Sequence, residues 1–347
     1  MSPGRRRAPR VLGLGLALAL ALAGLVVSGC TAGDAGDDAA LGGDAARPFP
    51  TDAAWEMQLA DSTALYIALS VVDANTVWAS GSGGRVARTV DGGATWSVTQ
   101  VPGEEEAQFR DVHAVSADEA YVLSIPTPIS RIYHTLDGGA TWTAVFEAES
   151  DAVFMDCFAF WDDASGFAFA DSRDGEFILM RSRDGTPWAR LDPAVVPDAR
   201  DGEGAFASSG TCTVARPGGL AWFATGASGV DTRVIRTTDY GETWAESITP
   251  LPSGDESSGI FSLTFRDDRN GAAFGGALSE PDSTHADVAI TADGGATWSL
   301  VGSTGLRGAV YGAAWVPGTE PAALVAASPD GTAVSTDGGR TWARIDS

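Results

Sequence analysis

The chain has 347 residues, 44% of them hydrophobic and 9% aromatic, which supports a sizeable core and excludes a wholly disordered protein. Its 46 acidic residues outnumber 22 basic ones, all arginine, and the net charge is −24. A surface this negative repels phosphate backbones, so nucleic acid is excluded as a partner.

The N-terminal segment has the layout of a secretory signal. Four arginines between residues 5 and 10 precede an apolar run at 11–27, which is short for a membrane span. The run ends in Val27-Ser28-Gly29-Cys30, which resembles the bacterial lipobox, whose cysteine receives a diacylglyceryl group. Residues 1–29 therefore predict a lipoprotein signal peptide and Cys30 a lipidation site. The alternative is an ordinary signal peptide.

A linker and a folded domain follow the signal. Residues 30–50 are dominated by Ala, Gly and Asp, and they predict a flexible acidic tether. Residues 51–347 carry the aromatic and strand-forming residues and are expected to form the folded part. The expected location is extracytoplasmic, with the protein held at the membrane as a bacterial lipoprotein.

One motif, hydroxyl-x-Asp-x-Gly-x-Thr-Trp, recurs six times from residue 89 onward, and only the third copy is degraded. The Asp carboxylate can accept hydrogen bonds from backbone N–H groups of the turn. The glycines allow positive φ, and the tryptophan then buries a large ring at the start of the next strand. The motif aspartates are Asp91, Asp137, Asp184, Asp239, Asp293 and Asp337, and the tryptophans are Trp96, Trp142, Trp188, Trp244, Trp298 and Trp342.

Apolar segments and polar turns alternate between the motifs. In the first repeat, strands are expected at 66–72 and 77–80, a third at 85–91 enters the motif, and a fourth at 95–101 leaves it. The other repeats share this order. Four short antiparallel strands in each of six repeats indicate an all-β protein, a β-propeller of four-stranded antiparallel blades.

The motif resembles the Asp-box, or BNR, repeat of sialidase-type β-propellers. In that family the box is the turn between the third and fourth strands, away from the binding face, so it implies a structural role. Six blades are favoured over seven. The segment at 53–61 resembles a fourth strand without a box, which would either close the ring on the last blade or begin a seventh one.

Candidate binding residues lie in the connections at the other face, around the expected central channel. Loops on a rigid scaffold often bind ligands, and the longest one spans 192–210. Its charges are expected at the channel mouth, where nearby arginines would form a patch for carboxylates. The alternative is a solvated loop whose arginines neutralise their neighbours. The candidates are Arg110, Arg173, Arg200, Asp201, Glu203 and Arg307.

The remaining chemistry-bearing residues give weaker signals. Cys157 and Cys212 occupy the same strand position in consecutive repeats. They are compatible with a disulfide outside the cytoplasm, but equivalent positions point the same way round a ring, which favours two buried thiols. The three histidines lack ligand spacing, and the acids at 171–176 lack that of a calcium loop. Neither a metal nor a cofactor is expected.

The whole repeat also resembles the photosystem II stability/assembly factor family, most clearly at 77–96, VWASGSGGRVARTVDGGATW. That resemblance implies a non-enzymatic module that binds a protein, including membrane-protein assembly intermediates, through an arginine-rich face. The strong acidity is a departure from that family. The alternative function is a sialidase-like glycoside hydrolase with a glycan ligand. The Arg-Ile-Pro motif that sialidases carry before their first Asp box is, however, missing before Asp91.

Overall fold

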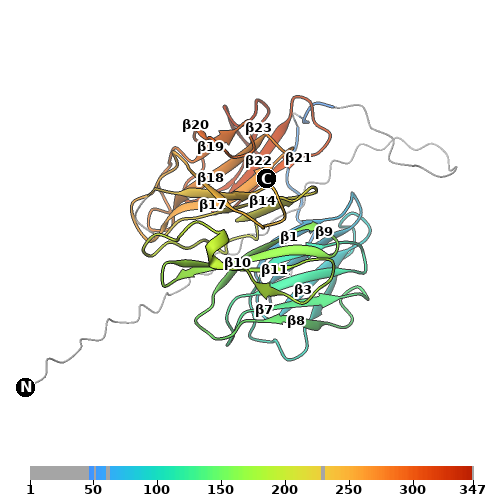
Figure 1. Ribbon diagram of the computed structural model, residues 1–347. Helices are drawn as coiled ribbons and strands as arrows, with labels where there is room; N and C mark the ends of the chain where they lie inside the picture. Colours follow the sequence, from blue (N-terminus) through green and yellow to red (C-terminus); the bar gives the residue numbers. More distant parts are fainter. Residues whose placement is uncertain (1–46, 51, 60–62, 228–230, 346–347) are drawn as a thin grey trace, which may run out of the picture.

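A computed structural model describes residues 47–50, 52–59, 63–227 and 231–345. They form six antiparallel sheets of four strands each, in sequence order within every sheet, and the protein is a six-bladed all-β propeller (Figure 1). The expected signal peptide, Cys30 and the first part of the tether lie outside the described residues.

The first three blades contain strands β1 to β12. Blade 1 is β1 (Tyr66–Val71), β2 (Val77–Gly81), β3 (Arg85–Thr89) and β4 (Ser97–Gln100). Blade 2 is β5 (Phe109–Ala114), β6 (Ala120–Ser124), β7 (Arg131–Thr135) and β8 (Thr143–Glu147). Blade 3 is β9 (Met155–Asp162), β10 (Ser165–Arg173), β11 (Glu176–Ser182) and β12 (Ala189–Arg190).

The last three blades contain β13 to β24. Blade 4 is β13 (Thr213–Arg216), β14 (Leu220–Ala224), β15 (Arg233–Thr237) and β16 (Ala245–Ile248). Blade 5 is β17 (Ser258–Phe265), β18 (Gly271–Ala277), β19 (Val288–Thr291) and β20 (Ser299–Gly302). Blade 6 is β21 (Gly312–Val316), β22 (Ala323–Ser328), β23 (Gly331–Ser335) and β24 (Ala343–Ile345). A short 3₁₀ helix, η1 (Pro193–Val195), precedes blade 4.

The Asp boxes close the turns between third and fourth strands with a fixed set of hydrogen bonds. In blade 1 the Thr89 hydroxyl donates to Asp91 Oδ1 (2.8 Å) and accepts from the N–H of Gly93 (2.9 Å). Thr95 donates its N–H to Asp91 Oδ1 (2.8 Å) and its hydroxyl to Oδ2 (2.6 Å). The same set recurs at Asp137, Asp239, Asp293 and Asp337.

The degraded third box has lost this closure. Asp184 has a positive φ of 51°, and within the described residues its carboxylate has no hydrogen-bond partner. The Ser182 hydroxyl donates to the Thr186 carbonyl instead. The strand that follows, β12, has only two residues. The chain then leaves blade 3 early and enters the long connection to blade 4.

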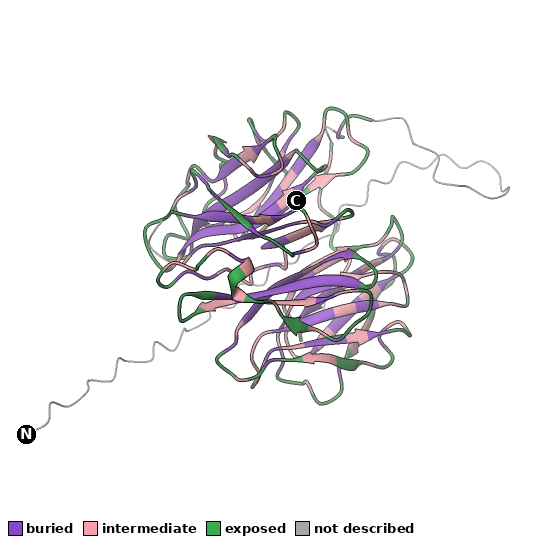
Figure 2. Ribbon diagram, in the orientation of Figure 1, coloured by how far each residue is buried: buried purple, intermediate pink, exposed green. Residues whose placement is uncertain are grey.

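Apolar clusters between neighbouring blades make up the core, seen as the buried strand interiors in Figure 2. One cluster joins each of the five successive pairs of blades from 1 to 6. Box tryptophans extend these contacts: Trp142 of blade 2 meets Trp78 of blade 1 edge to face, with ring centroids 6.4 Å apart. The boxes therefore stabilise packing between blades as well as turns within them.

The N-terminal residues 47–50 and 52–59, here called the strap, pack against blade 6 and reach blade 1 at Gln58. Phe49 and Trp55 pack on Val334 and Ile345, which lie on the opposite face of blade 6 from blade 5. Trp55 also donates to the Thr332 hydroxyl. Blade 6 takes all four of its strands from the C-terminal sequence. The expected fourth strand at 53–61 is thus wrong for residues 53–59, which pack against a sheet face rather than pair with its edge.

We predict that Asp293→Asn lowers the free energy of unfolding by about 1 kcal/mol, as for other side chains that cap backbone N–H groups. The hydrogen bond from the Thr297 hydroxyl is the main cause that lowers the pKa of Asp293 to about 2. Since this is below the unfolded value, the stabilisation is present above about pH 4 and lost as the pH falls towards 2. Urea unfolding at several pH values measures it. Asp184→Asn, in the degraded box, is the control and should have little effect; equal losses would contradict the assignment.

Candidate functional site

The connection between β12 and β13 crosses the centre of the propeller. Residues 203–212, here called the plug, contact the first strand, or the residue before it, in five other blades. The contacts are Ala68 of blade 1, Arg110 and Asp111 of blade 2, Cys157 of blade 3, Phe261 and Ser262 of blade 5, and Tyr311 of blade 6. The plug itself leads into blade 4, and Gly204 pairs with Gly226 there through two backbone hydrogen bonds. The mouth of the channel is therefore closed by the chain's own residues.

Individual contacts hold the plug at fixed positions. The ring of Phe206 stacks on Phe261 with centroids 4.0 Å apart, and Arg110 donates to the Ala207 carbonyl (3.2 Å). Gly210 has a φ of 76°, and a Cβ there would lie 2.2 Å from a carboxylate oxygen of Asp111. Only glycine fits such a position, because both the backbone conformation and the neighbouring carboxylate exclude a side chain.

A buried ion pair anchors the start of the plug. Glu203 and Arg233 have side chains that are 0% and 3% exposed, and the Arg233 Nε lies 2.9 Å from Glu203 Oε1. Arg233 also bonds to Glu246 and donates to the Asp198 carbonyl (3.0 Å), while Glu203 Oε2 accepts from the N–H of Arg200 (2.9 Å). The expectation that Glu203 presents a charge at the channel mouth is therefore wrong. Its carboxylate is buried and paired with Arg233.

The disulfide holds the other end of the plug. Cys157 of β9 is bonded to Cys212, with a Cα–Cα distance of 6.1 Å. The preference for two buried thiols is wrong, although the cysteines do hold equivalent positions: Cys157 pairs with Phe169 of β10, and the Cys212 carbonyl accepts from the N–H of Ala224 of β14. The first strands of the neighbouring blades 3 and 4 lie close enough together for the two sulfur atoms to bond.

We predict that Glu203→Gln lowers the free energy of unfolding by about 3 kcal/mol, because it leaves Arg233 charged in a buried site with one carboxylate fewer. Asp201→Asn is the matched control: Asp201 is exposed two residues away, and its change should cost less than 0.5 kcal/mol, roughly the limit for surface substitutions. Chemical denaturation measures both. Similar, small effects would show that Glu203 is not a structural anchor.

The four candidate arginines lie at one face but do not form one cluster. Arg110 is largely buried beneath the plug, where burial lowers its pKa. Arg200 donates to the Asp231 carbonyl (3.0 Å), and Arg173 lies 3.6 Å from Asp174. Arg307 lies in the connection before blade 6. Each guanidinium has a different local partner.

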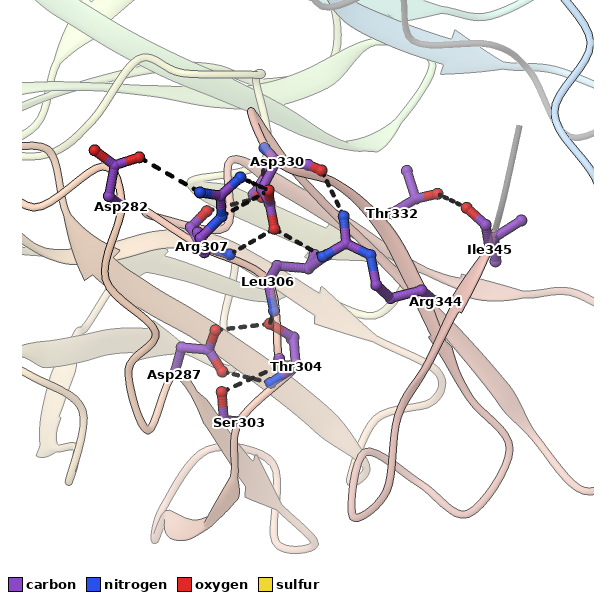
Figure 3. A network of polar contacts seen from close by, with 12 residues as sticks. Asp282, Asp287, Ser303, Thr304, Leu306, Arg307, Asp330, Thr332, Arg344 and Ile345 are labelled. Atoms are coloured by element: carbon purple, nitrogen blue, oxygen red, sulfur yellow. Dashed lines mark hydrogen bonds and ion pairs between the residues drawn. The ribbon is translucent and has the colours of Figure 1, made fainter.

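Arg307 belongs to a polar network that contains a second arginine, Arg344 (Figure 3). The Asp330 carboxylate accepts from Nε and a terminal nitrogen of Arg307 (2.9 and 2.6 Å) and from Arg344 (2.7 Å). These contacts hold the pKa of Asp330 well below its usual value, and the hydrogen bond from Arg307 contributes most. Asp330 is 10% exposed, whereas Arg307 and Arg344 are 54% and 47% exposed. The network thus presents two guanidiniums to solvent around the Asp330 carboxylate, and a carboxylate oxygen of the exposed Asp282 lies 3.6 Å from a terminal nitrogen of Arg307.

The sequence gives no local signal for Arg344 or Asp330. Arg344 follows the last box tryptophan by two residues, and Asp330 lies in an ordinary turn before β23. Only the alignment of β23 beside β24 brings Arg344 to the loop that holds Asp330. We call Arg307, Asp330 and Arg344 the arginine clamp.

Arg173 lines a groove of about 320 Å³ between blades 2 and 3. Its lining includes the apolar side chains of Phe146, Val153, Ile178 and Met180, together with Arg190. Arg190 is the last residue of the shortened β12, so the groove lies where the fourth strand of blade 3 ends early.

Two buried carboxyls lie among the first strands. Asp111 accepts hydrogen bonds from the N–H groups of Val112 (2.8 Å) and Phe158 (2.9 Å), yet burial raises its pKa well above the usual value. Burial, together with the charge of Asp171, also raises the pKa of Asp156. Among the described residues no group of His, Cys, Asp and Glu is arranged to hold a metal ion. None of the helices in that part of the chain is long and apolar enough to cross a membrane.

Comparison with known proteins supports the fold and one family resemblance. Residues 48–150 match the family model described as photosynthesis system II assembly factor YCF48. None of the curated proteins is similar enough to the chain to count as a match.

Three solved structures illustrate the similarity. One is described as YCF48 bound to D1 peptide (17% identity, 78% of this chain, 93% of that chain, TM-score 0.45). Another is YCF48 from Cyanidioschyzon merolae (18%, 81%, 98%, 0.42). The third is the GH74 xyloglucanase from Xanthomonas campestris (14%, 80%, 45%, 0.54). At these identities the likeness concerns the fold. Residues 48–150 thus resemble the photosystem II assembly factor family, within a six-bladed β-propeller.

Proposed function

We propose that this propeller is a non-enzymatic binding module that engages a protein partner through its loop face, in the manner of an assembly factor. We further propose that it acts outside the cytoplasm, held at the membrane by a lipid on Cys30. The match of residues 48–150 to the assembly-factor family supports the class of function. By analogy with that family, the partner is a segment of a membrane protein.

The observation that carries this proposal is the plug. Small-molecule sites are concave and enclose most of their ligand. Here residues 203–212 occupy the channel mouth and contact the first strands around it, so the loop face offers a broad surface with side grooves. Such a surface suits a macromolecule that spreads over several loops.

The arginine clamp is the element of this face best suited to a carboxylate. Guanidinium groups held in a fixed orientation bind carboxylates through paired N–H donors. Asp330 fixes Arg307 and Arg344 while leaving both about half exposed. In a protein of net charge −24, such a local pair of cations would select an acidic group of the partner while the rest of the surface repels polyanions.

We predict that the double variant Arg307→Ala/Arg344→Ala reduces capture of the partner by about tenfold or more, equivalent to roughly 1.4 kcal/mol. Crosslinking in membranes of the source cell, followed by quantification of co-purified proteins, measures capture. Arg183→Ala is the control, because Arg183 is 42% exposed but lies beside a box at the opposite face. Equal loss in the control, or no loss in the double variant, would contradict the clamp.

The same preparation tests the alternative of a glycoside hydrolase. Fluorogenic sialosides and other aryl glycosides should not be turned over by the parent protein. Robust turnover that disappears in Asp201→Asn would replace the binding module with an enzyme.

We predict that Cys30→Ser releases the protein from the membrane fraction, because a thioether-linked diacylglyceryl group cannot form on serine. Fractionation of cells, with mass spectrometry of the new N-terminus, measures this. Ser28→Ala is a control that leaves the thiol in place. A Cys30→Ser protein that is cleaved and still membrane-bound would disprove the lipid anchor.

A further inference from the structure

The Asp-box face of blades 1 and 2 carries a group of exposed aliphatic side chains. Val71, Val90 and Leu136 are 68%, 53% and 68% exposed, and Met57 of the strap is 63% exposed. They are four of the seven large hydrophobic residues that are most exposed in the described part of the chain. We call these four residues the aliphatic patch.

The box geometry explains why two of these side chains point outward. Val90 and Leu136 each stand between the box hydroxyl and the box aspartate, whose side chains bond to each other within the turn. The intervening residue cannot join that closure and faces solvent. The other four boxes have Arg183, Thr238, Ala292 and Thr336 at this position. A large aliphatic residue there is thus confined to two neighbouring blades.

Contacts between the elements that carry the patch place them side by side. The strap reaches blade 1 through Gln58, whose amide lies 3.4 Å from the carbonyl of Gly92 in the first box. Arg88 of blade 1 donates to the Ala117 carbonyl of blade 2, and a Cβ on Gly138 of the second box would lie 2.1 Å from its guanidinium. The strap, the first box and the second box therefore lie in sequence across one face.

The described chain begins at this same face. Arg47 forms a short parallel bridge with Thr319, and its carbonyl accepts from the N–H of Glu320 (2.9 Å). Both residues lie in the turn between β21 and β22, at the same end of the blade as the boxes. The 46 preceding residues contain the apolar run and Cys30. Residues 31–46 number 16, and a flexible tether of that length, as expected from the sequence, would span about 20–24 Å on average.

From this placement we propose that the aliphatic patch rests on the lipid bilayer, so that the Asp-box face is membrane-proximal and the loop face is turned outward. The proposal rests on the proposed lipid anchor. The tether alone leaves the propeller free to rotate, whereas a patch on the face at which the strap begins gains from the high effective concentration of lipid. Weak apolar contacts are then sufficient to fix the orientation.

The charges around the aliphatic patch indicate which lipid headgroups it can approach. Asp73 lies in the turn after β1, and Asp91 and Asp137 lie in the two boxes, all exposed. Hydrogen bonds within its turn, mainly from the side chain of Thr95, lower the pKa of Asp91. The three carboxylates therefore stay ionised. They repel anionic headgroups. The bilayer that fits this face is zwitterionic, such as phosphatidylcholine or phosphatidylethanolamine.

The full, lipidated chain in phosphatidylcholine vesicles tests this orientation. Val90→Cys and Leu278→Cys place the same environment-sensitive dye at the two faces, since Leu278 follows β18 at the loop end and is 46% exposed. We expect a blue-shifted emission and at least threefold stronger quenching by brominated lipid at Val90→Cys only. Replacing a third of the lipid by phosphatidylserine should reduce the difference.

Three results would overturn the proposal, and the first two distinguish a failed orientation from a failed anchor. Protein that floats with the vesicles but shows equal emission and quenching at the two positions keeps its anchor and disproves the orientation. Protein that fails to float disproves the anchor and the orientation with it. The triple variant Val71→Ser/Met57→Ser/Leu136→Ser, with the dye at Val90→Cys, should float normally and lose most of the quenching; unchanged quenching would also count against the patch.

Discussion

The hydrogen-bonded pair of a box hydroxyl and a box aspartate is the interaction on which the blades depend. One carboxylate satisfies the N–H and the hydroxyl of a threonine four residues later, and the preceding hydroxyl caps a glycine N–H. This closure sets the exit of the fourth strand and places the tryptophan against the neighbouring blade. Where it is lost, at Asp184, the fourth strand shrinks to two residues, a groove opens, and the chain departs towards the channel.

The path of the chain after β12 connects the repeat with the degraded Asp box to the plug at the loop face. The long connection leaves β12 and places residues 203–212 against the first strands. A buried ion pair between Glu203 and Arg233 at one end and the Cys157–Cys212 bond at the other fix its path. A connection of this length could equally carry a binding loop. Here Glu203, the charged residue of the plug, anchors the connection, and the proposed function assigns recognition to the rim, where the clamp of Arg307 and Arg344 is exposed.

The two faces and the seam then acquire different roles. At the seam, the strap covers the side of blade 6 with Phe49 and Trp55, and it passes on to blade 1 through Gln58. Because the strap begins at the box face, attachment of the preceding residues to a membrane would bring that face towards the lipid. The loop face would then remain available to a partner. In the proposed arrangement the acidic surface would limit unspecific association, and the arginine clamp and the aliphatic patch would supply the specific contacts.

The sequence by itself determined the repeat, the strand order and the turn chemistry, because each depends on residues within a few positions of one another. The hydrogen bonds that join Asp91 to the preceding hydroxyl and to Thr95 all lie within one turn. The alternation of side chains between the two faces of a strand follows from the backbone geometry. The tertiary structure alone decided the position of Glu203, which meets Arg233 thirty residues later, and of Cys212, which meets Cys157 on the neighbouring blade. It also decided the strap and the clamp. These depend on which blade lies beside which, and composition cannot distinguish a polar loop in solvent from one that fills a channel.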